Sequence, residues 1–452
     1  MEASGESVRH TNGIWTADED SLPYLSAGEM KRPPIKLILS LVGYCNLRCF
    51  HCLGTSEEMV RASQDPTSAQ PELIDFLVDH VIPGVRAIRL GGVGYTEQLM
   101  SRSFDYFMQR MQPHAPHLGY FELTTNLSVM TEARADLLAQ SLTDLQVSIE
   151  GVGDNFTKIR GMPWHRLVKN FQVIREAKRR YPKSRMKITL LVCAMSDMLD
   201  DLLRFDVFQD LGVENIIIRE LYSRAEHHEK HVLHRAPEKT RAFIREFRKR
   251  AEERGIEHHF LIAPLATTSI AQQPLAEATA IRRPSSRPEL GRCTLPFEVL
   301  TVVHTGRFGV CCYITDLAGP PASLSTLNIM DVWNSPRFVA LRRAVNSSSP
   351  PPTCLTCEVK VGHLSEEEKA SMMIQVENDK LGAEVEAPKR LEAALREAVA
   401  RAEQAETRTA ELVHALDERD RTIDAMTRTR VWRMAGRWWA LKRAVSEFFR
   451  RR

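Results

Sequence analysis

From Ile35 onward the chain alternates short β-branched apolar runs with longer amphipathic stretches, and this alternation constrains the fold most. The apolar runs occupy residues 35–43, 86–92, 119–126, 145–151, 186–194 and 214–221. The stretches with helical spacing of apolar residues are 72–82, 97–111, 132–142, 165–180 and 197–212. Strands that alternate with helices form a parallel sheet with right-handed crossovers, so we predict an α/β fold closed as a barrel or partial barrel. Its active site would lie at the carboxyl ends of the strands.

The length and composition of the chain indicate several domains. Its 452 residues are enough for two or three domains of roughly 150 residues each. The barrel domain ends with a basic helix near 237–254 and a strand near 256–263. A Pro/Ser/Ala-rich stretch follows, and after it comes a small module with five of the nine cysteines. A long helical pattern with about five heptads predicts a coiled coil, most simply a homodimer, although a solvated single helix would share the pattern. We expect the boundaries 1–34 (extension), 35–263 (barrel), 264–290 (linker), 291–362 (cysteine module), 364–428 (coiled coil) and 429–452 (basic amphipathic helix).

Charge and hydropathy narrow the class of protein. A formal net charge of +3 excludes a nucleic-acid binder by composition, although nine Lys/Arg against one Glu make residues 428–452 strongly basic. No apolar run reaches the ~18–20 residues of a membrane span, and the first residues lack the order of a secretory signal. We therefore expect a cytoplasmic protein, whose odd number of cysteines suits metal ligation better than disulfides.

Three of these cysteines follow the first apolar run directly. Cys45, Cys49 and Cys52 stand as C-x3-C-x2-C. Three thiolates on one tight loop can bind three irons of a cubane cluster and leave the fourth iron open. The alternatives are a structural zinc ion, which needs four ligands, and a packing role.

In this motif and its position the chain resembles the radical S-adenosylmethionine (SAM) superfamily, whose fold is a partial (β/α)6 TIM-like barrel. The resemblance implies that SAM binds the open iron of a [4Fe–4S] cluster. An electron from a flavodoxin- or ferredoxin-type donor then cleaves SAM to a 5′-deoxyadenosyl radical, which abstracts a hydrogen atom from substrate carbon.

Other segments extend the resemblance. Gly91 and Gly92 match the glycines that approach the SAM methionine amine, although the acid that usually follows directly is missing and Glu97 comes later. Residues 148–161 resemble the S-I-D-G…iRG stretch of the SPASM and twitch subgroup, with Glu150 in place of Asp. The resemblance then implies SAM contacts by Asn126, Ser148 and Glu150, which could otherwise be strand-end caps. It also implies that His51, at the family's usual aromatic position, packs at the adenine.

A second set, C-x17-C…C-x2-C, is formed by Cys293, Cys311, Cys354 and Cys357. Four thiolates complete a site without a vacancy, either a [4Fe–4S] cluster or a zinc ribbon. The set resembles the twitch form of the SPASM domain, which binds one auxiliary [4Fe–4S] cluster. Cys312 could replace Cys311, but the spacing from Gly306 favours Cys311.

Relatives with this spacing include a dehydrogenase of an aminocyclitol alcohol, in which the auxiliary cluster accepts one electron. We therefore expect an oxidoreductase that acts on a sugar, nucleotide-sugar or cyclitol-like substrate. An epimerase, a peptide-modifying maturase and a membrane-docked iron–sulfur scaffold are the alternatives. The catalytic base is not evident, and Arg219, Glu220 and Tyr222, at the end of the sixth run, are the candidates.

Two further segments complete the expectations. The tail 429–452 places apolar side chains on one face and Arg/Lys on the other, which suits an anionic inner-membrane surface, while a buried dimer contact is the alternative. The histidines at 227, 228, 231 and 234 lie in a polar stretch and are expected to be solvated surface.

Overall fold

The computed structural model describes residues 28–52, 65–93, 95–221, 226–261, 292–319, 321, 323–324, 326–347, 350–357, 404, 408–409, 411–426 and 428–450. Inter-residue contacts divide the chain into two compact units, Met1–Lys369 and Ala370–Arg452. All nine cysteines belong to the described residues, and none of them is in a disulfide.

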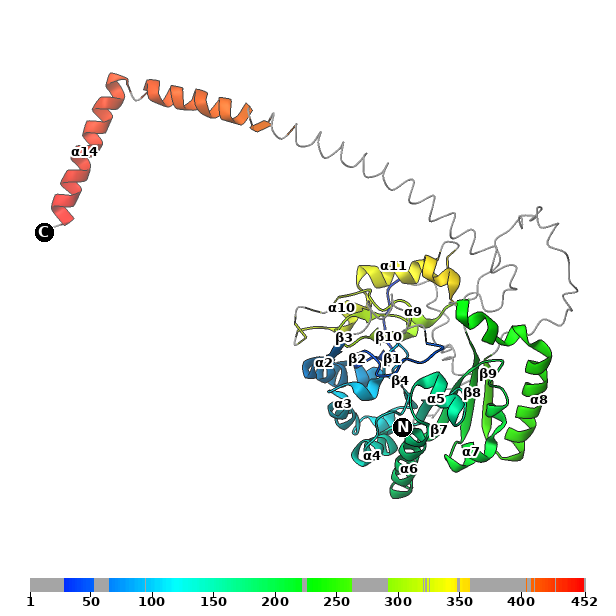
Figure 1. Ribbon diagram of the computed structural model, residues 1–452. Coiled ribbons are helices and arrows are strands. Elements are labelled where there is room, and N and C mark those ends of the chain that lie inside the picture. Colours follow the sequence, from blue (N-terminus) through cyan, green and yellow to red (C-terminus); the bar gives the residue numbers. More distant parts are fainter. Residues whose placement is uncertain are drawn as a thin grey trace, which may run out of the picture. The chain divides into compact units, whose positions relative to one another are not determined.

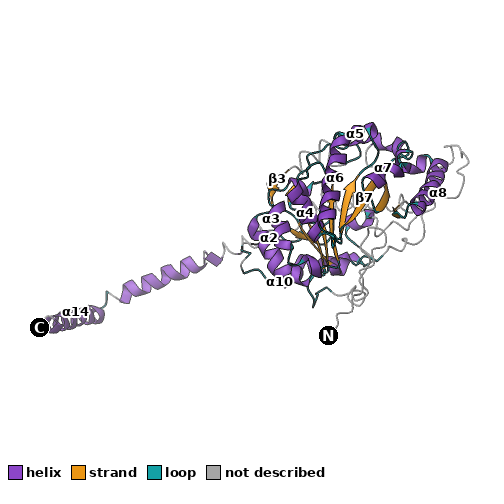
Figure 2. Ribbon diagram, turned by 90° about the horizontal axis from the view of Figure 1, so that it is seen from below, coloured by secondary structure: helices purple, strands orange, loops and turns teal. Residues whose placement is uncertain are grey.

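A nine-stranded, mostly parallel sheet runs through the first unit (Figures 1 and 2). Its order is β11-β10-β1-β4-β5-β6-β7-β8-β9, and only β11 is antiparallel to its neighbour. The six predicted strands are β1 (Lys36–Leu39), β4 (Ala87–Leu90), β5 (Tyr120–Thr125), β6 (Asp144–Ser148), β7 (Lys187–Ala194) and β8 (Asn215–Glu220). They are adjacent in chain order, as in a partial (β/α)6 TIM-like barrel, so the predicted α/β class is confirmed.

Both edges of this six-stranded core are extended. On one side the predicted strand near 256–263 is β9 (Glu257–Leu261), which pairs with β8. On the other side β10 (Val299–Val302) pairs in parallel with β1, and β11 (Phe308–Gly309) pairs with β10. The segment around the second set of cysteines is therefore built onto the barrel sheet. A separate two-stranded sheet joins β2 (Val42–Gly43) and β3 (Asp65–Ser68).

Helices cover the outer face of the sheet, as Figures 1 and 2 show. The α-helices of the first unit are α2 (Pro71–Phe76), α3 (Phe104–Met111), α4 (Glu132–Ser141), α5 (Asp154–Arg160), α6 (Trp164–Arg180), α7 (Phe205–Asp210), α8 (Pro237–Glu253), α9 (Leu295–Glu298), α10 (Ile329–Trp333) and α11 (Pro336–Val345). Shorter turns are the π-helix η3 (Leu77–Val81) and the 3-10 helices η4 (Ile82–Gly84), η5 (Gln98–Met100), η6 (Ala115–His117), η7 (Asp201–Leu203), η8 (Glu226–His231), η9 (Leu233–Arg235) and η10 (Pro352–Thr356).

The strands explain why one face of the sheet is apolar and the other polar. Side chains alternate between faces along a strand. In β5, Phe121 and Leu123 are buried in the main hydrophobic cluster with Phe107 of α3. Tyr120 and Glu122 alternate with them and make polar contacts on the inner face. The helices thus bury the apolar positions, and polar groups line the inside of the barrel.

The second unit contains α14 (Arg430–Arg450) and a helical stretch at 411–426. Large apolar side chains of both stretches are exposed, among them Leu412, Leu416, Trp438 and Trp439. The coiled coil, which needs a second copy, stays a prediction. Within the described residues, no helix combines the length and apolar character that crossing a bilayer requires.

Candidate functional site

A cavity of about 490 Å³ opens at the carboxyl ends of the parallel strands. Its lining includes ten of the residues predicted from the sequence: Cys45, Cys49, His51, Cys52, Gly92, Asn126, Ser148, Glu150, Arg219 and Glu220. Gly91 lies next to it but does not line it, and Tyr222 lies outside the described residues. Segments more than 170 residues apart in sequence therefore meet at one place, as expected for strand ends of a parallel sheet.

Hydrogen-bond donors lie beside two sulfurs of the cysteine triad, those of Cys45 and Cys49. Asn126 Nδ2 lies 3.6 Å from Cys45 Sγ, and the amide of Leu47 lies 3.5 Å from the same sulfur. Arg160 Nη1 lies 3.6 Å from Cys49 Sγ. Burial raises the pKa of Cys49 to about 11 even though Arg160 favours its thiolate. These donors can stabilise a negative charge on the sulfur, but the Cys49 thiol needs more positive charge than the protein supplies before it ionises.

Glu97 holds together the corner of the cavity between β4 and β5. This buried carboxylate accepts hydrogen bonds from Thr125 Oγ1 at 2.7 Å and from the backbone amide of Asn126 at 2.6 Å. Gly91, at φ 100°, adopts the left-handed backbone that favours glycine, and a Cβ there would lie 3.4 Å from the Thr124 carbonyl oxygen. Glu97 thus fixes the start of the loop that carries Asn126, and its own pKa is raised by burial.

Glu150 is buried in an ion pair rather than open to solvent. Its carboxylate is 1% exposed and accepts both Nε and Nη2 of Arg160 at 2.5 Å. His51 Nε2 lies 3.4 Å from the same carboxylate, yet burial lowers the pKa of His51 and favours its neutral form. Arg160 therefore links Glu150 to Cys49 in one bidentate arrangement.

The histidines after β8 correct one expectation. The rings of His227, His228 and His231 surround Phe50 of the triad loop, with centroids 5.2, 5.7 and 5.2 Å from its ring. His228 is 1% exposed, and its Nε2 lies 3.2 Å from the Phe50 carbonyl oxygen. The prediction of solvated surface is wrong for this residue because the loop packs back onto the triad, whereas His234 has a 61% exposed side chain.

The second set of cysteines lies in the segment that joins β1. Asn346 fixes the backbone of Cys293 with two hydrogen bonds of 2.9 and 3.0 Å. Cys311 Sγ accepts the Ile314 amide at 3.3 Å and is half-buried, while Cys312 is exposed. Burial raises the pKa of Cys311 to about 12. The spacing from Gly306 favours Cys311 as the ligand, and this choice stays a prediction.

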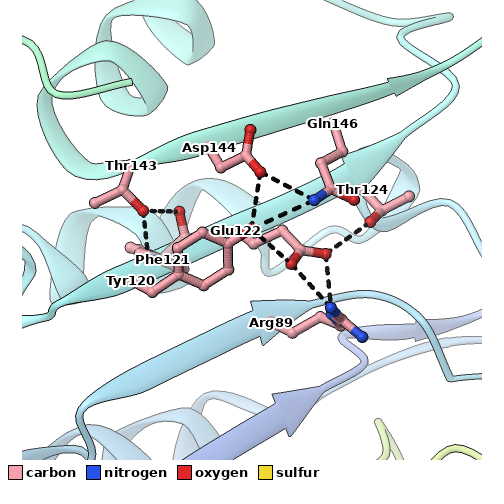
Figure 3. Close-up of polar contacts among 8 residues, drawn as sticks. All are labelled: Arg89, Tyr120, Phe121, Glu122, Thr124, Thr143, Asp144 and Gln146. Carbon is pink, nitrogen blue, oxygen red and sulfur yellow. Dashed lines mark hydrogen bonds and ion pairs between the residues drawn. The ribbon is translucent and has the colours of Figure 1, made fainter. Parts of the chain in front are cut away.

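A polar network fills the inside of the barrel (Figure 3). Glu122 pairs with Arg89 at 2.9 Å, and the Tyr120 hydroxyl lies 3.0 Å from Glu122 Oε2 and 2.8 Å from Asp144 Oδ2. Burial, together with the charge of Glu122, raises the pKa of Asp144 to about 6. The sequence analysis missed this network, although every second residue of β5 and β6 is polar.

Two more cavity residues were not singled out as site residues. Tyr313 comes from the segment of the second cysteine set and lines the same cavity as the triad. Cys193 also lines it, and burial raises its pKa to about 12, so it is a neutral thiol. No single-chain pattern distinguishes these two residues from ordinary packing residues, because their position depends on long-range contacts.

The donor set fits iron–sulfur clusters and SAM. The triad supplies three sulfurs with hydrogen-bond donors beside two of them, and polar groups of Asn126, Ser148 and Glu150 stand around the same space. No three His, Cys, Asp or Glu side chains among the described residues come close enough together to hold a single metal ion. Each thiolate of a cubane cluster binds a different iron, so cluster thiolates need not converge on one point.

Family models match both parts of the first unit. The radical SAM superfamily model matches residues 39–204, and the model of the SPASM iron–sulfur cluster-binding domain matches residues 293–358. Together they span about half of the chain. The GTP 3′,8-cyclase of Gloeobacter violaceus is 30% identical over 128 residues, which are 28% of this chain and 38% of the cyclase.

Solved structures show more distant similarity. Streptococcus suis SuiB bound to S-adenosylmethionine has 14% identity and a TM-score of 0.48, covering 75% of this chain and 73% of SuiB. The anSMEcpe structure with bound AdoMet and the Cp18Cys peptide has 15% identity and a TM-score of 0.46, covering 69% of this chain and 84% of that one.

The two family matches identify the cofactors as SAM, a SAM-binding [4Fe–4S] cluster and an auxiliary [4Fe–4S] cluster. The match to the first model begins in β1 and includes the triad, and the match to the second begins at Cys293 and includes Cys357. The chain belongs to the radical SAM superfamily and is an iron–sulfur enzyme with a SPASM-type domain.

Proposed function

We propose that this enzyme dehydrogenates an alcohol of a sugar, nucleotide-sugar or cyclitol-like substrate. When bound, SAM and its cluster supply a 5′-deoxyadenosyl radical that abstracts hydrogen from carbon, and the auxiliary cluster accepts one electron. The chain's own residues bind the cofactors, orient the substrate and exclude water. One observation carries the proposal: the triad and Tyr313, two residues after Cys311, line the same cavity.

This shared lining favours dehydrogenation over epimerisation. An alcohol carbon that has lost a hydrogen atom must lose one more electron and one proton to become a carbonyl. A substrate between the triad loop and the SPASM segment lies next to residues of both, so an electron acceptor is near the reacting carbon. A redox-neutral epimerisation would have no use for such an acceptor.

Each predicted site residue receives a role in this proposal. Cys45, Cys49 and Cys52 hold the SAM-binding cluster, and Cys293, Cys311, Cys354 and Cys357 hold the auxiliary one. SAM is oriented by the side chains of His51, Asn126, Ser148 and Glu150 and by the backbone at Gly91 and Gly92. Arg160 keeps Glu150 in place. Arg219 and Glu220 face the substrate, and Tyr222, which follows them in sequence, is a further candidate for contact.

The test is anaerobic reconstitution with SAM, reductant and candidate substrates deuterated at the alcohol carbon. We expect deuterium in 5′-deoxyadenosine and a product two mass units lighter than the unlabelled alcohol. Deuterium transfer with a product of the same mass as the unlabelled alcohol, in which a hydrogen atom from a donor has replaced the deuterium, would indicate epimerisation. Failure with every sugar, nucleotide sugar and cyclitol, together with modification of a peptide, would refute the substrate class.

The tail receives a separate proposal. We infer that residues 428–452 bind an anionic inner-membrane surface, because α14 exposes Trp432, Trp438 and Trp439 beside several arginines and one lysine. Deletion of the tail should reduce co-sedimentation with vesicles of phosphatidylglycerol and phosphatidylcholine but leave SAM cleavage unchanged. Unchanged sedimentation, with loss of dimer by light scattering, would instead place the tail at a contact between copies.

The remaining partners are also proposals. We expect a flavodoxin- or ferredoxin-type protein to deliver the electron for SAM cleavage, and the 364–428 segment to form a homodimeric coiled coil. The exposed apolar residues Leu412, Leu416, Ile423 and Met426 support the second expectation.

A further inference from the structure

Two arginines on the inner face of the barrel differ in their counter-charges. Arg89 of β4 pairs with Glu122 at 2.9 Å, and the register of β4 with β5 places the two residues opposite each other (Figure 3). Arg219, near the end of β8, stands opposite Cys193 of β7 and lines the cavity. Within the described residues Arg219 forms no ion pair, and its buried Nε has no hydrogen-bond partner.

The acids near Arg219 are already engaged. Glu122 is held by Arg89, Glu150 by Arg160, and the carboxylate of Glu220 lies 3.7 Å from His234. Burial lowers the pKa of Arg219, and the positive charge of Arg89 lowers it further. Arg219 is half-buried, and Glu122, whose charge favours the guanidinium, is already paired with Arg89. The planar donors of a guanidinium match the oxygens of a phosphate group, which would supply a counter-charge from the cavity.

We propose that Arg219 is the anchor for a phosphate group of the substrate, so that the substrate is a phosphorylated or nucleotide-linked sugar rather than a neutral one. The inference rests on the proposed function only in taking the occupant to be a sugar. A phosphate at Arg219 would sit in the cavity shared by the triad and Tyr313, and would fix the sugar there by a charge-assisted contact.

The SAM carboxylate and the negative charge of the auxiliary cluster are the competing partners of Arg219. Tyr313 lines the same cavity as Arg219, so the second cysteine segment is near. The experiment must therefore measure three quantities in the same variants: affinity for a phosphate probe, affinity for SAM, and the reduction potential of the auxiliary cluster.

The probe is inorganic pyrophosphate, titrated calorimetrically into the reconstituted holoenzyme with SAM present. We expect Arg219→Gln to weaken pyrophosphate binding about 10- to 100-fold, as loss of one charge-assisted contact does. Arg219→Lys should retain part of the affinity, and Arg166→Gln, an exposed arginine on α6, should retain all of it. SAM affinity and the auxiliary potential should be unchanged in Arg219→Gln.

Each contrary result overturns the proposal. Absence of pyrophosphate binding by the wild type, or equal binding by Arg219→Gln, removes the phosphate anchor. A tenfold loss of SAM affinity assigns Arg219 to the SAM carboxylate, and a shifted auxiliary potential with unchanged pyrophosphate affinity assigns it to the cluster. Pyrophosphate binding is measured without turnover, so it tests the phosphate anchor even if no sugar transfers deuterium. If the Arg219→Gln enzyme oxidises a neutral cyclitol as well as the wild type does, the phosphate anchor is refuted and the proposed function is retained.

Discussion

The two sets of cysteines reach their positions in different ways. The triad occupies one loop after β1, and side chains from other strands and helices, Asn126 and Arg160, donate to its sulfurs. The second set comes from three segments, and the donor to Cys311 is a backbone amide. The first site stands at an open cavity with room for SAM, while four thiolates complete the second. A local motif thus marks the reactive site, whereas the predicted ligands of the auxiliary cluster come from segments far apart in the sequence.

The largest expected effect comes from Cys49→Ala. The triad site loses one of three ligands, so reductive SAM cleavage should be abolished while about four of eight irons per chain remain at the second site. Chromatographic measurement of 5′-deoxyadenosine and iron analysis check this. SAM cleavage at the wild-type rate would show that Cys49 is not needed for the cluster that binds SAM, and would contradict the assignment of the reactive site to the triad.

Cys354→Ala is the matched change in the second set. Cleavage of SAM should continue, because the triad is intact, but substrate oxidation should fall at least tenfold for want of an electron acceptor. The measurement is product per 5′-deoxyadenosine, which should drop sharply. A ratio equal to that of the wild type would show that the second cluster takes no electron from substrate.

Asn346→Ala sharpens the comparison without removing a ligand. It deletes both hydrogen bonds to the backbone of Cys293, and loss of such supporting contacts typically costs 10- to 100-fold in metal affinity. Iron release to a chelator should therefore become faster at the second site only. Asn328→Ala, which removes the cap of α10 in the same segment, is the control and should leave iron release unchanged. Equal iron loss from both variants would mean that general unfolding explains the effect.

Asp144→Asn tests the barrel interior apart from either cluster. The folded-state pKa of Asp144 lies near 6, above its ordinary value of 3.8, so the folded state binds its proton more tightly than the unfolded state. Stability from this group is present below about pH 4 and is lost as pH rises through about 6, a change of at most roughly 3 kcal/mol. The variant, which resembles the protonated acid, should unfold at a higher temperature than the wild type at pH 8 and similarly at pH 4.

Thermal unfolding of the holoenzyme at both pH values measures this difference. The exposed Asp210→Asn serves as the control and should show no such dependence. A variant that is less stable than the wild type at pH 8 would show that Asp144 is favoured as a carboxylate in the folded state.

Much of the fold followed from the sequence because its signals are local. Alternating apolar runs located all six core strands, and the C-x3-C-x2-C spacing placed three cysteines that line the cavity. Pairing of β10 with β1 was not predictable, since no local pattern specifies a partner more than 250 residues away. The packing of His228 on Phe50, 178 residues apart, was missed for the same reason. The Arg160–Glu150 pair spans only ten residues, but its geometry depends on how strand β6 and helix α5 are placed, which the sequence pattern does not specify.

The most direct test of the central claim uses the Cys354→Ala enzyme, in which the triad cluster should dominate the spectrum. The account predicts that adding SAM to the anaerobically reconstituted, reduced protein changes its electron paramagnetic resonance signal, because SAM binds the open iron. A signal that is identical with and without SAM would contradict it.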